Sequence, residues 1–160
     1  MNITKNFEIQ EFVPPEIYNK YGEKSTWFIS PEIPIIAQEL RDSLSDKFSG
    51  NRVIVKINDW HTGGDYKYSG YRPPNIDDEI KGAFLSQHKL GKAMDIKVYL
   101  NNNKLDPKEI YKFILDNKTK FMNLGLTTME DINYTKTWNH LDCRNRLNGQ
   151  NLQDILIVKP

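Results

Sequence analysis

The sequence predicts an α+β fold, in which a small, mostly antiparallel sheet is flanked by helices. Residues 93–98 alternate between apolar and polar side chains, which is the period-two pattern of a strand. Residues 53–58 are rich in β-branched side chains, which favour strands. From Pro31 onward, apolar residues recur at the spacing of an amphipathic helix. The chain has 160 residues, of which 38% are hydrophobic, so we expect one domain over residues 1–160 with a single core.

Helices are expected in three places. Residues 14–20 form a short helix, because proline is tolerated in a first turn. Ser30 is the expected N-cap of a longer helix with Pro31 at its first position. Asp106 is the expected N-cap of a third helix, and Pro107 occupies its first position.

Loops and further strands fill the rest of the chain. Residues 60–65 and 69–74 are expected to be loops, and residues 101–103 a turn. Residues 137–143 and 151–158 are expected to form strands.

Charge and composition exclude several classes of protein. The 22 basic and 21 acidic residues leave a net charge of +1 and form no basic block, so we expect no nucleic-acid partner. No apolar run is long enough to span a membrane, and no signal peptide is visible at the start. The single cysteine, Cys143, excludes an internal disulfide and a cysteine-based zinc site, and a packed thiol is expected there.

His88 and Asp95 form a candidate metal half-site. They stand seven positions apart, across a turn that contains Gly91 and Ala93, whose small side chains are expected to let the backbone pass close to the metal. Zinc binds nitrogen and oxygen ligands, and catalytic zinc sites use three protein groups and leave one position open. His140 is the expected third ligand. A single histidine is more often a surface or hydrogen-bonded core residue, so the combination carries the argument.

The strand expected around His140 has its own pattern. A period of two places Trp138, His140 and Asp142 on one side of this strand. His140 and Asp142 could therefore serve one site. Likewise, one face of the strand at residues 93–98 is expected to be buried while the other carries Asp95.

Three blocks of the sequence resemble the signature blocks of the M15 peptidase family. In chain order they are Ser69-Gly70-Tyr71-Arg72, Ser86-x-His88-x-x-Gly91-x-Ala93-x-Asp95 and Trp138-x-His140-x-Asp142. The opening residues 7–12 also resemble that family, so the likeness covers roughly residues 7–145. The family includes D-alanyl-D-alanine carboxypeptidases and dipeptidases, and the L-alanyl-D-glutamate endopeptidases of phage lysins. The resemblance implies a hedgehog/DD-peptidase-like fold.

The same resemblance implies a site and a substrate. It implies Zn²⁺ held by His88, Asp95 and His140, with a peptidoglycan stem peptide as the substrate. It also implies that Arg72 binds or polarises a carbonyl or carboxylate of that substrate, which suits its forked, permanently charged group. The alternative for Arg72 is a loop arginine that pairs with Asp77 or Asp78.

The chain departs from the family at the general base. Many members have a carboxylate three residues before the last zinc histidine, where this chain has Thr137. Glu130 is the favoured substitute, because it precedes the ligand strand and could lie on a neighbouring strand. Asp131 and His61 remain alternatives, since a histidine can also accept a proton near neutral pH. Glu130 could instead belong to an acidic loop tip in water.

Aromatic residues and His61 are candidate substrate contacts. His61 and Trp138 are expected to contact substrate if they do not act otherwise. The aromatic side chains near the proposed site could line a cleft or simply close the core. They are Trp60, Tyr66, Tyr68, Tyr71 and Trp138.

The leading functional hypothesis is a hydrolase: a zinc-dependent metallopeptidase that cleaves peptidoglycan stem peptides by metal-activated water. The chain would then be made in the cytoplasm and reach the bacterial cell wall after release, as an endolysin of a bacteriophage, or within a virion. The second hypothesis is a catalytically weak or inactive M15-like domain that serves as a phage virion structural or wall-binding module, with virion proteins as partners. A calcium-dependent domain like secreted hedgehog ranks last, because no carboxylate cluster suggests a calcium site.

Overall fold

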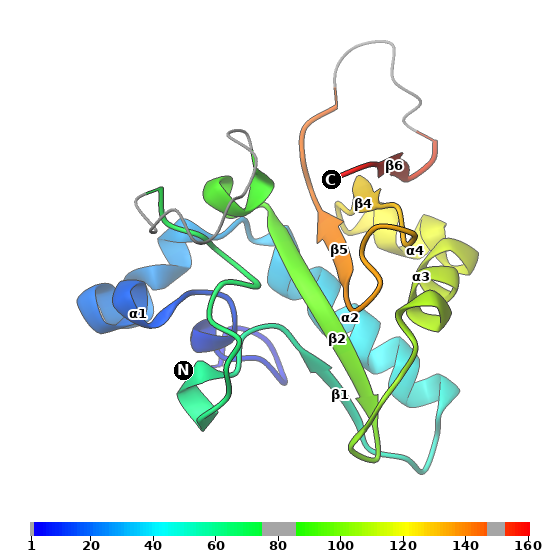
Figure 1. Cartoon of the computed structure of the whole chain (residues 1–160), viewed down its shortest axis with the longest axis horizontal. Helices are drawn as coiled ribbons and strands as arrows, with labels where there is room; N and C mark the ends of the chain where they lie inside the picture. The colour runs from blue at the N-terminus through cyan, green and yellow to red at the C-terminus, as the bar shows by residue number, and fades with distance from the viewer. Residues whose placement is uncertain (1, 75–85, 147–152) are drawn as a thin grey trace.

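The computed structural model of the chain describes residues 2–74, 86–146 and 153–160 (Figure 1). Over these residues the architecture is α+β, as predicted, and it consists of four α-helices and a mixed six-stranded sheet. The strands are β1 (Val53–Lys56), β2 (Ala93–Leu100), β3 (Asn103–Lys104), β4 (Thr128–Glu130), β5 (Asn139–Asp142) and β6 (Leu156–Val158). The helices are α1 (Pro15–Tyr21), α2 (Glu32–Lys47), α3 (Pro107–Asp116) and α4 (Lys118–Asn123).

Strand β2 organises the sheet. The strand order is β1-β2-β5-β4-β6, with β3 also paired to β2, and only the β4–β6 pairing is parallel. Residues 97–100 of β2 pair with β1, whereas residues 93–96 pair with β5. The edge of residues 93–96 that faces away from β5 is therefore open to a loop. Ser69 binds at this edge, where its carbonyl accepts the backbone N–H of Asp95 at 2.7 Å.

The predicted helices are confirmed, with one correction at a helix start. Asp106 caps α3 as expected, since its side chain accepts the backbone N–H of Lys108. The N-cap of α2 is Pro31 rather than Ser30. The hydroxyl of Ser30 instead donates to the carboxylate of Glu32, so it bonds a side chain and not the free backbone N–H groups of the first turn.

The predicted strands also form, but they are shorter than the patterns suggested. Strand β5 covers four residues of the expected 137–143, because residues 135–138 lie in a turn where Trp138 donates its N–H to the carbonyl of Thr135. Strand β6 covers three residues of the expected 151–158, of which 151–152 lie outside the described residues. Residues 101–102 form the expected turn, with positive φ at both asparagines.

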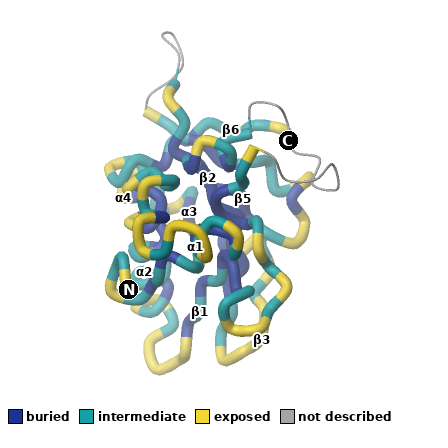
Figure 2. Tube along the Cα trace, turned by 90° about the vertical axis from the view of Figure 1, so that its left-hand side faces the viewer, coloured by how far each residue is buried: buried dark blue, intermediate teal, exposed yellow. Residues whose placement is uncertain are grey.

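The hydrophobic core lies between α2 and the sheet (Figures 1 and 2). Met94, Ile96 and Val98 reach it from β2, and Leu40 and Leu44 reach it from α2. Cys143 is also buried against this core, as predicted for a packed thiol.

The opposite face of β2 corrects an expectation. Only the face opposite Asp95 was expected to be buried, yet Asp95 and its neighbour on the same face, Lys97, are both only 8% exposed. Side chains of the loop at residues 66–72 lie against this face: Arg72 contacts Asp95, and Ser69 and Tyr66 contact Lys97. The ligand-bearing side of β2 is therefore buried, which strengthens electrostatic interactions there.

Among the described residues, no α-helix combines the length and the apolar character that a membrane span requires.

Candidate metal centre

Three elements bring His88, Asp95 and His140 together. His88 lies in a 3₁₀ turn (Gln87–Leu90) directly before β2, Asp95 lies in β2, and His140 lies in β5. Asp95 and His140 are direct partners in the antiparallel β2–β5 pair, so their side chains leave the same face as neighbours. All three residues are buried, and one ligand atom from each lies within 4.8 Å of the other two.

The 3₁₀ turn depends on a glycine. Gly91 ends the turn with a φ of 67°, a left-handed backbone conformation that residues other than glycine rarely adopt. A Cβ at this position would lie 1.9 Å from the carbonyl oxygen of Phe28. The small residue therefore allows a close backbone approach next to His88, as the sequence predicted.

The three ligand atoms form a nearly regular triangle. His88 Nε2 lies 3.2 Å from His140 Nδ1 and 3.3 Å from Asp95 Oδ1, and His140 Nδ1 lies 2.9 Å from Asp95 Oδ1. Ligands placed tetrahedrally at about 2.0–2.1 Å from an ion are about 3.3 Å apart. The group could therefore hold a metal ion with little rearrangement.

The outer contacts of the two imidazoles leave both inner nitrogens free to act as ligands. His88 Nδ1 lies 2.7 Å from the carbonyl oxygen of Gly70, which can only accept, so Nδ1 carries the proton. His140 Nε2 lies 3.3 Å from a carboxylate oxygen of Asp142, which sets the other proton in the same way. In neutral imidazoles, the remaining lone pairs then face Asp95. Three electron-rich atoms in one buried place require a cation, either a proton or a metal ion.

The pKa values describe this demand for a cation. Burial acts to lower the pKa of His140, but hydrogen bonds to Asp142 and Asp95 outweigh it and raise the pKa to about 9. Burial lowers the pKa of His88. Burial also opposes ionisation of Asp95, but His88 and His140 hold the pKa of that carboxyl well below its usual range. Without a metal, His140 therefore holds the proton that neutralises the centre at neutral pH.

Asp142 and Arg144 support His140 from behind. Asp142 is fully buried and accepts hydrogen bonds from Arg144 Nε, from Arg144 Nη2 and from the backbone N–H of Arg144. This bidentate pair keeps the carboxylate charged and in position below His140 Nε2. The predicted association of His140 with Asp142 is thus present, and Arg144 is its unpredicted partner.

Residues 68–72 form a loop that supports the centre from the other side. Arg72 Nη2 donates to Asp95 Oδ2 at 2.7 Å, and Arg72 Nε donates to the carbonyl of Tyr68 at 2.6 Å. Arg72 thereby orients the carboxylate whose other oxygen faces the histidines. The alternative partners Asp77 and Asp78 lie outside the described residues. The fit of this loop depends on Gly70, because a Cβ there would lie 2.2 Å from the carbonyl oxygen of Phe12.

Glu130 approaches the centre from β4. Its Oε1 lies 3.9 Å from His140 Nδ1, and its side chain is 18% exposed. Burial raises the pKa of Glu130, so its carboxyl accepts a proton more readily than an exposed glutamate. The alternative of an acidic loop tip is wrong, since Glu130 lies in β4, which pairs with both β5 and β6, and its side chain is largely buried.

The other expected site residues lie in separate surroundings. His61 packs edge-on against Trp60 and interacts with Glu8 and Asp59, and no contact with the three ligands occurs within the described residues. Asp131 accepts hydrogen bonds from Asn133 in a turn after β4.

Thr137 and three of the aromatic residues make the following contacts. The carbonyl of Thr137 accepts a hydrogen bond from Lys104, and Trp138 is half-buried in the turn before β5. Trp60 Nε1 donates to the carbonyl of Val13, and Tyr71 packs against Phe28, so these two rings close the structure.

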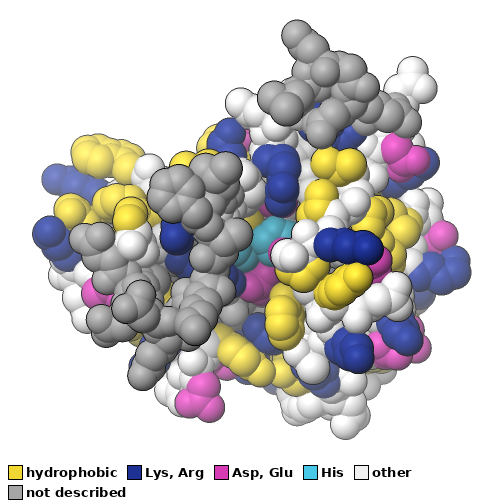
Figure 3. All heavy atoms as spheres, turned by 45° about the horizontal axis from the view of Figure 1, so that its top comes forward, with side chains coloured by type: hydrophobic (Ala, Val, Ile, Leu, Met, Phe, Trp, Pro, Cys, Tyr) yellow, Lys and Arg dark blue, Asp and Glu magenta, His cyan; other side chains and the backbone are white. Residues whose placement is uncertain are grey.

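On the molecular surface, histidine side chains lie beside acidic ones in a hollow of one face (Figure 3). The face also shows several basic side chains near the hollow.

Sequence reasoning missed Gly70, Arg144 and Lys97. Gly70 is part of a block that had been singled out, but its carbonyl contact with His88 depends on how the loop docks on β2. Arg144 follows Asp142 by two positions, a spacing that favours a same-side ion pair in extended chain. Lys97 follows Asp95 by two positions, and this is the signal that places it on the site face.

Comparisons with known proteins add no relative. No family model matches the sequence, no curated protein matches it, and no solved structure matches the fold.

Proposed function

We propose that this protein is a zinc-dependent metallopeptidase with a hedgehog/DD-peptidase-like fold, and that its substrates are peptidoglycan stem peptides. The observation that supports this most is the convergence of two imidazole nitrogens and one carboxylate oxygen, with a further carboxylate, Glu130, 3.9 Å from one of those nitrogens. The three sequence blocks that resemble the M15 family supply the substrate class.

The donor set favours zinc among the common metal ions. Calcium and magnesium prefer six or more oxygen ligands, whereas His88 and His140 contribute nitrogen and only Asp95 contributes oxygen. Three protein ligands with a tetrahedral spacing leave one position open, as in catalytic zinc sites. The partners of His88 and His140 on their outer nitrogens are of the kinds that zinc-binding histidines use.

The residues around the centre fit the steps of amide hydrolysis. When bound, Zn²⁺ supplies a Lewis acid that activates water at neutral pH and polarises a carbonyl. Glu130 takes a proton from the attacking water as the new C–O bond forms, and it returns this proton to the amine nitrogen as the C–N bond breaks. The raised pKa of Glu130 suits a group that both accepts and returns a proton.

Arg72 has two tasks in this proposal. It orients Asp95 through the 2.7 Å contact with Oδ2. Its guanidinium also brings positive charge next to Asp95, close to where a substrate carbonyl would gain negative charge during the reaction.

Thr137 favours a second candidate function. It occupies the position at which many M15 members have the base, so an inactive domain that binds cell-wall peptide, with virion proteins as partners, is the alternative. The two candidates differ in whether Glu130 replaces the missing carboxylate.

Digestion of purified peptidoglycan fragments, followed by mass analysis of the products, tests the proposal. We expect the zinc-loaded protein to release peptide fragments and Glu130→Gln to lower turnover by about a hundredfold. Asp131→Asn is the matched control, because it removes a neighbouring carboxylate that bonds Asn133, and it should leave turnover unchanged. Zinc binding without any product would favour the inactive domain, and failure to bind zinc would exclude the metallopeptidase.

A further inference from the structure

Three lysines share the site face of the sheet. Lys97 lies two positions after Asp95 on β2, so both side chains leave the same face. Lys56 of β1 is the direct cross-strand partner of Lys97, and Lys104 of β3 is paired with Tyr99, the next residue of that face. Like charges placed opposite each other in a sheet are destabilising unless each has a partner.

Two of these lysines have partners that satisfy them. Lys56 Nζ lies 2.8 Å from a carboxylate oxygen of Asp59, which neutralises its charge. Lys104 Nζ donates to the carbonyl of Thr137 at 2.7 Å, and its side chain is exposed to water.

Lys97 differs from both. It is only 8% exposed, its Nζ donates to the hydroxyl of Ser69 at 3.2 Å, and it lies 3.8 Å from the ring centroid of Tyr66. Within the described residues, no carboxylate lies at ion-pair distance from its ammonium. A mostly buried cation with only a hydroxyl and a ring as partners gains strongly from an anion that comes next to it.

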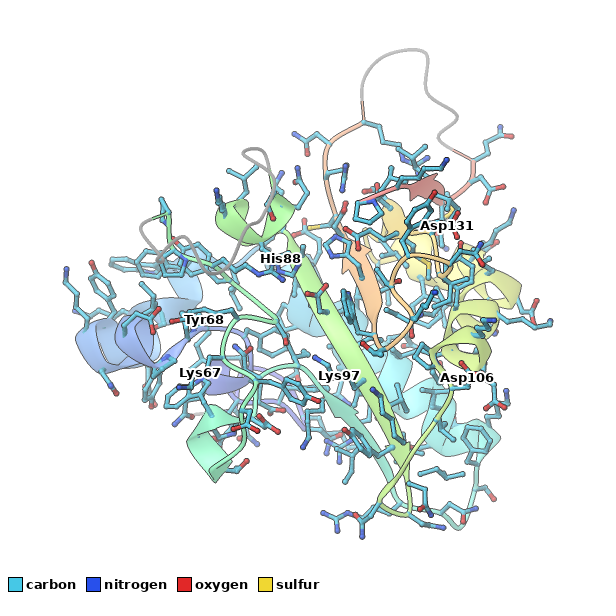
Figure 4. All side chains as sticks on the ribbon, viewed as in Figure 1. Lys67, Tyr68, His88, Lys97, Asp106 and Asp131 are labelled. Carbon is cyan, nitrogen blue, oxygen red and sulfur yellow. The ribbon has the colours of Figure 1, made fainter. Side chains whose placement is uncertain are left out.

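The position of the ammonium points to the metal centre. Ser69, which binds Lys97 Nζ, also accepts the backbone N–H of Asp95. The ammonium of Lys97 therefore contacts the same residue that hydrogen-bonds the backbone of Asp95. Figure 4 shows Lys97 on β2, further along the strand from His88, between Tyr68 on one side and Asp106 on the other.

The spacing suits a peptide that ends shortly after the scissile bond. Side chains two residues apart on one strand are about 7 Å apart at their bases, and a lysine side chain is long enough to span part of this separation. In a peptide, successive carbonyl carbons are separated by one residue repeat of about 3.5 Å. A scissile carbonyl at the centre would thus bring the next carboxylate toward Lys97.

We propose that Lys97, together with the hydroxyl of Ser69, binds the free carboxylate of the residue that follows the scissile bond, so that the preferred substrates are peptides cleaved at their C-terminal residue. This inference rests on the proposed function, because it assigns one end of the substrate of that same site. Lys97 is then a specificity-determining residue.

Binding of an analogue that cannot be cleaved tests the inference without turnover. The probe is a dipeptide analogue with a phosphinate in place of the scissile amide, prepared with either a free C-terminal carboxylate or a C-terminal amide. Calorimetry with the zinc-loaded protein should give at least about tenfold tighter binding of the acid than of the amide, as expected for a charge-assisted hydrogen bond. Lys97→Met should bind the acid and the amide equally.

Lys56→Met is the matched control. It removes a lysine from the same face, directly opposite Lys97 in the sheet, whose charge is already neutralised by Asp59. It should keep the preference for the acid.

Each possible result of these measurements supports or overturns the inference. Equal binding of acid and amide by the unaltered protein, or no binding of either, overturns the inference, and this measurement needs no variant to fold. A preference that persists in Lys97→Met also overturns it and assigns the carboxylate to another cation. Turnover of the corresponding cleavable peptides is measured separately: absence of product alone contradicts the proposed function, while loss of the acid preference alone contradicts this inference.

Discussion

The two halves of strand β2 are alike on one face and different on the other. On the core face, Met94 and Ile96 of the first half and Val98 of the second half all pack into the same hydrophobic cluster. On the site face, Asp95 of the first half contacts two histidines and an arginine, whereas Lys97 of the second half contacts a hydroxyl and a ring.

The change of partner strand explains the difference. The first half pairs with β5, which brings His140 opposite Asp95, and its other edge binds the loop at residues 68–72. The second half pairs with β1, which brings Lys56 opposite Lys97. Alternate residues of one strand therefore build the core and the site separately, so each can be altered with limited effect on the other.

Loss of a ligand in the first half should have the largest effect. His88→Ala removes one of three donors, and we expect zinc affinity to fall by more than about a hundredfold, beyond the loss typical for an outer partner. Equilibrium titration with zinc measures this. His61→Ala is the matched control, because this histidine lies beside Trp60 and away from the ligands, and equal losses in the two variants would contradict the assignment of His88.

Loss of the partner behind His140 should have a smaller effect on metal binding. Asp142→Asn keeps the shape of the side chain but removes the negative charge that contacts both Arg144 and His140. We expect zinc affinity to fall by about 10–100-fold. Thermal unfolding of the metal-free variant reports the separate cost of leaving Arg144 without its buried partner. A drop in unfolding temperature with unchanged zinc affinity would show that Asp142 serves the fold alone.

The pH should alter zinc affinity in one direction. His140, with its pKa raised to about 9, is protonated in the metal-free protein below that pH, so zinc must displace its proton. Apparent affinity should therefore rise about tenfold per unit between pH 6 and 8 if one proton is released. A titration at several pH values, with proton release measured from the buffer dependence of the binding heat, checks this. A flat profile would mean that His140 is neutral before the metal binds.

A change on the core face of the second half should spare the site. Val98→Ala leaves a small cavity and should lower the free energy of unfolding by about 1–3 kcal/mol. Zinc affinity, measured at a temperature where the variant is fully folded, should stay within about twofold, since distant changes of this kind are largely independent. Coupled losses of stability and affinity would refute the separation of the two faces.

The strands that bear the ligands were predictable because their patterns are local. The alternation at residues 93–98 identified β2, and the same period placed His140 and Asp142 on one side of β5. The small residue Gly91 correctly indicated a close backbone approach. Glu130 was also favoured ahead of its neighbour Asp131, and the structure brings only Glu130 of these two next to His140.

The remaining features depend on contacts that local patterns do not contain. The partner of Arg72 and the contact of Gly70 with His88 follow from docking of one loop on an open strand edge. The burial of Lys97 follows from the same docking, because Ser69 and Tyr66 contact its ammonium, and the alternation at residues 93–98 does not contain this information.

The packing of the loop at residues 68–72 limits how far the chain can be shortened. Phe12, whose carbonyl accepts the N–H of Tyr71, is fully buried together with Phe7 and Ile9. These opening residues contact none of the three ligands, yet the loop packs against them. A shortened chain that begins after Val13 would keep every metal-binding side chain but would lose the packing that holds the loop against His88 and Asp95. A minimal fragment intended to bind zinc therefore has to start before Phe7.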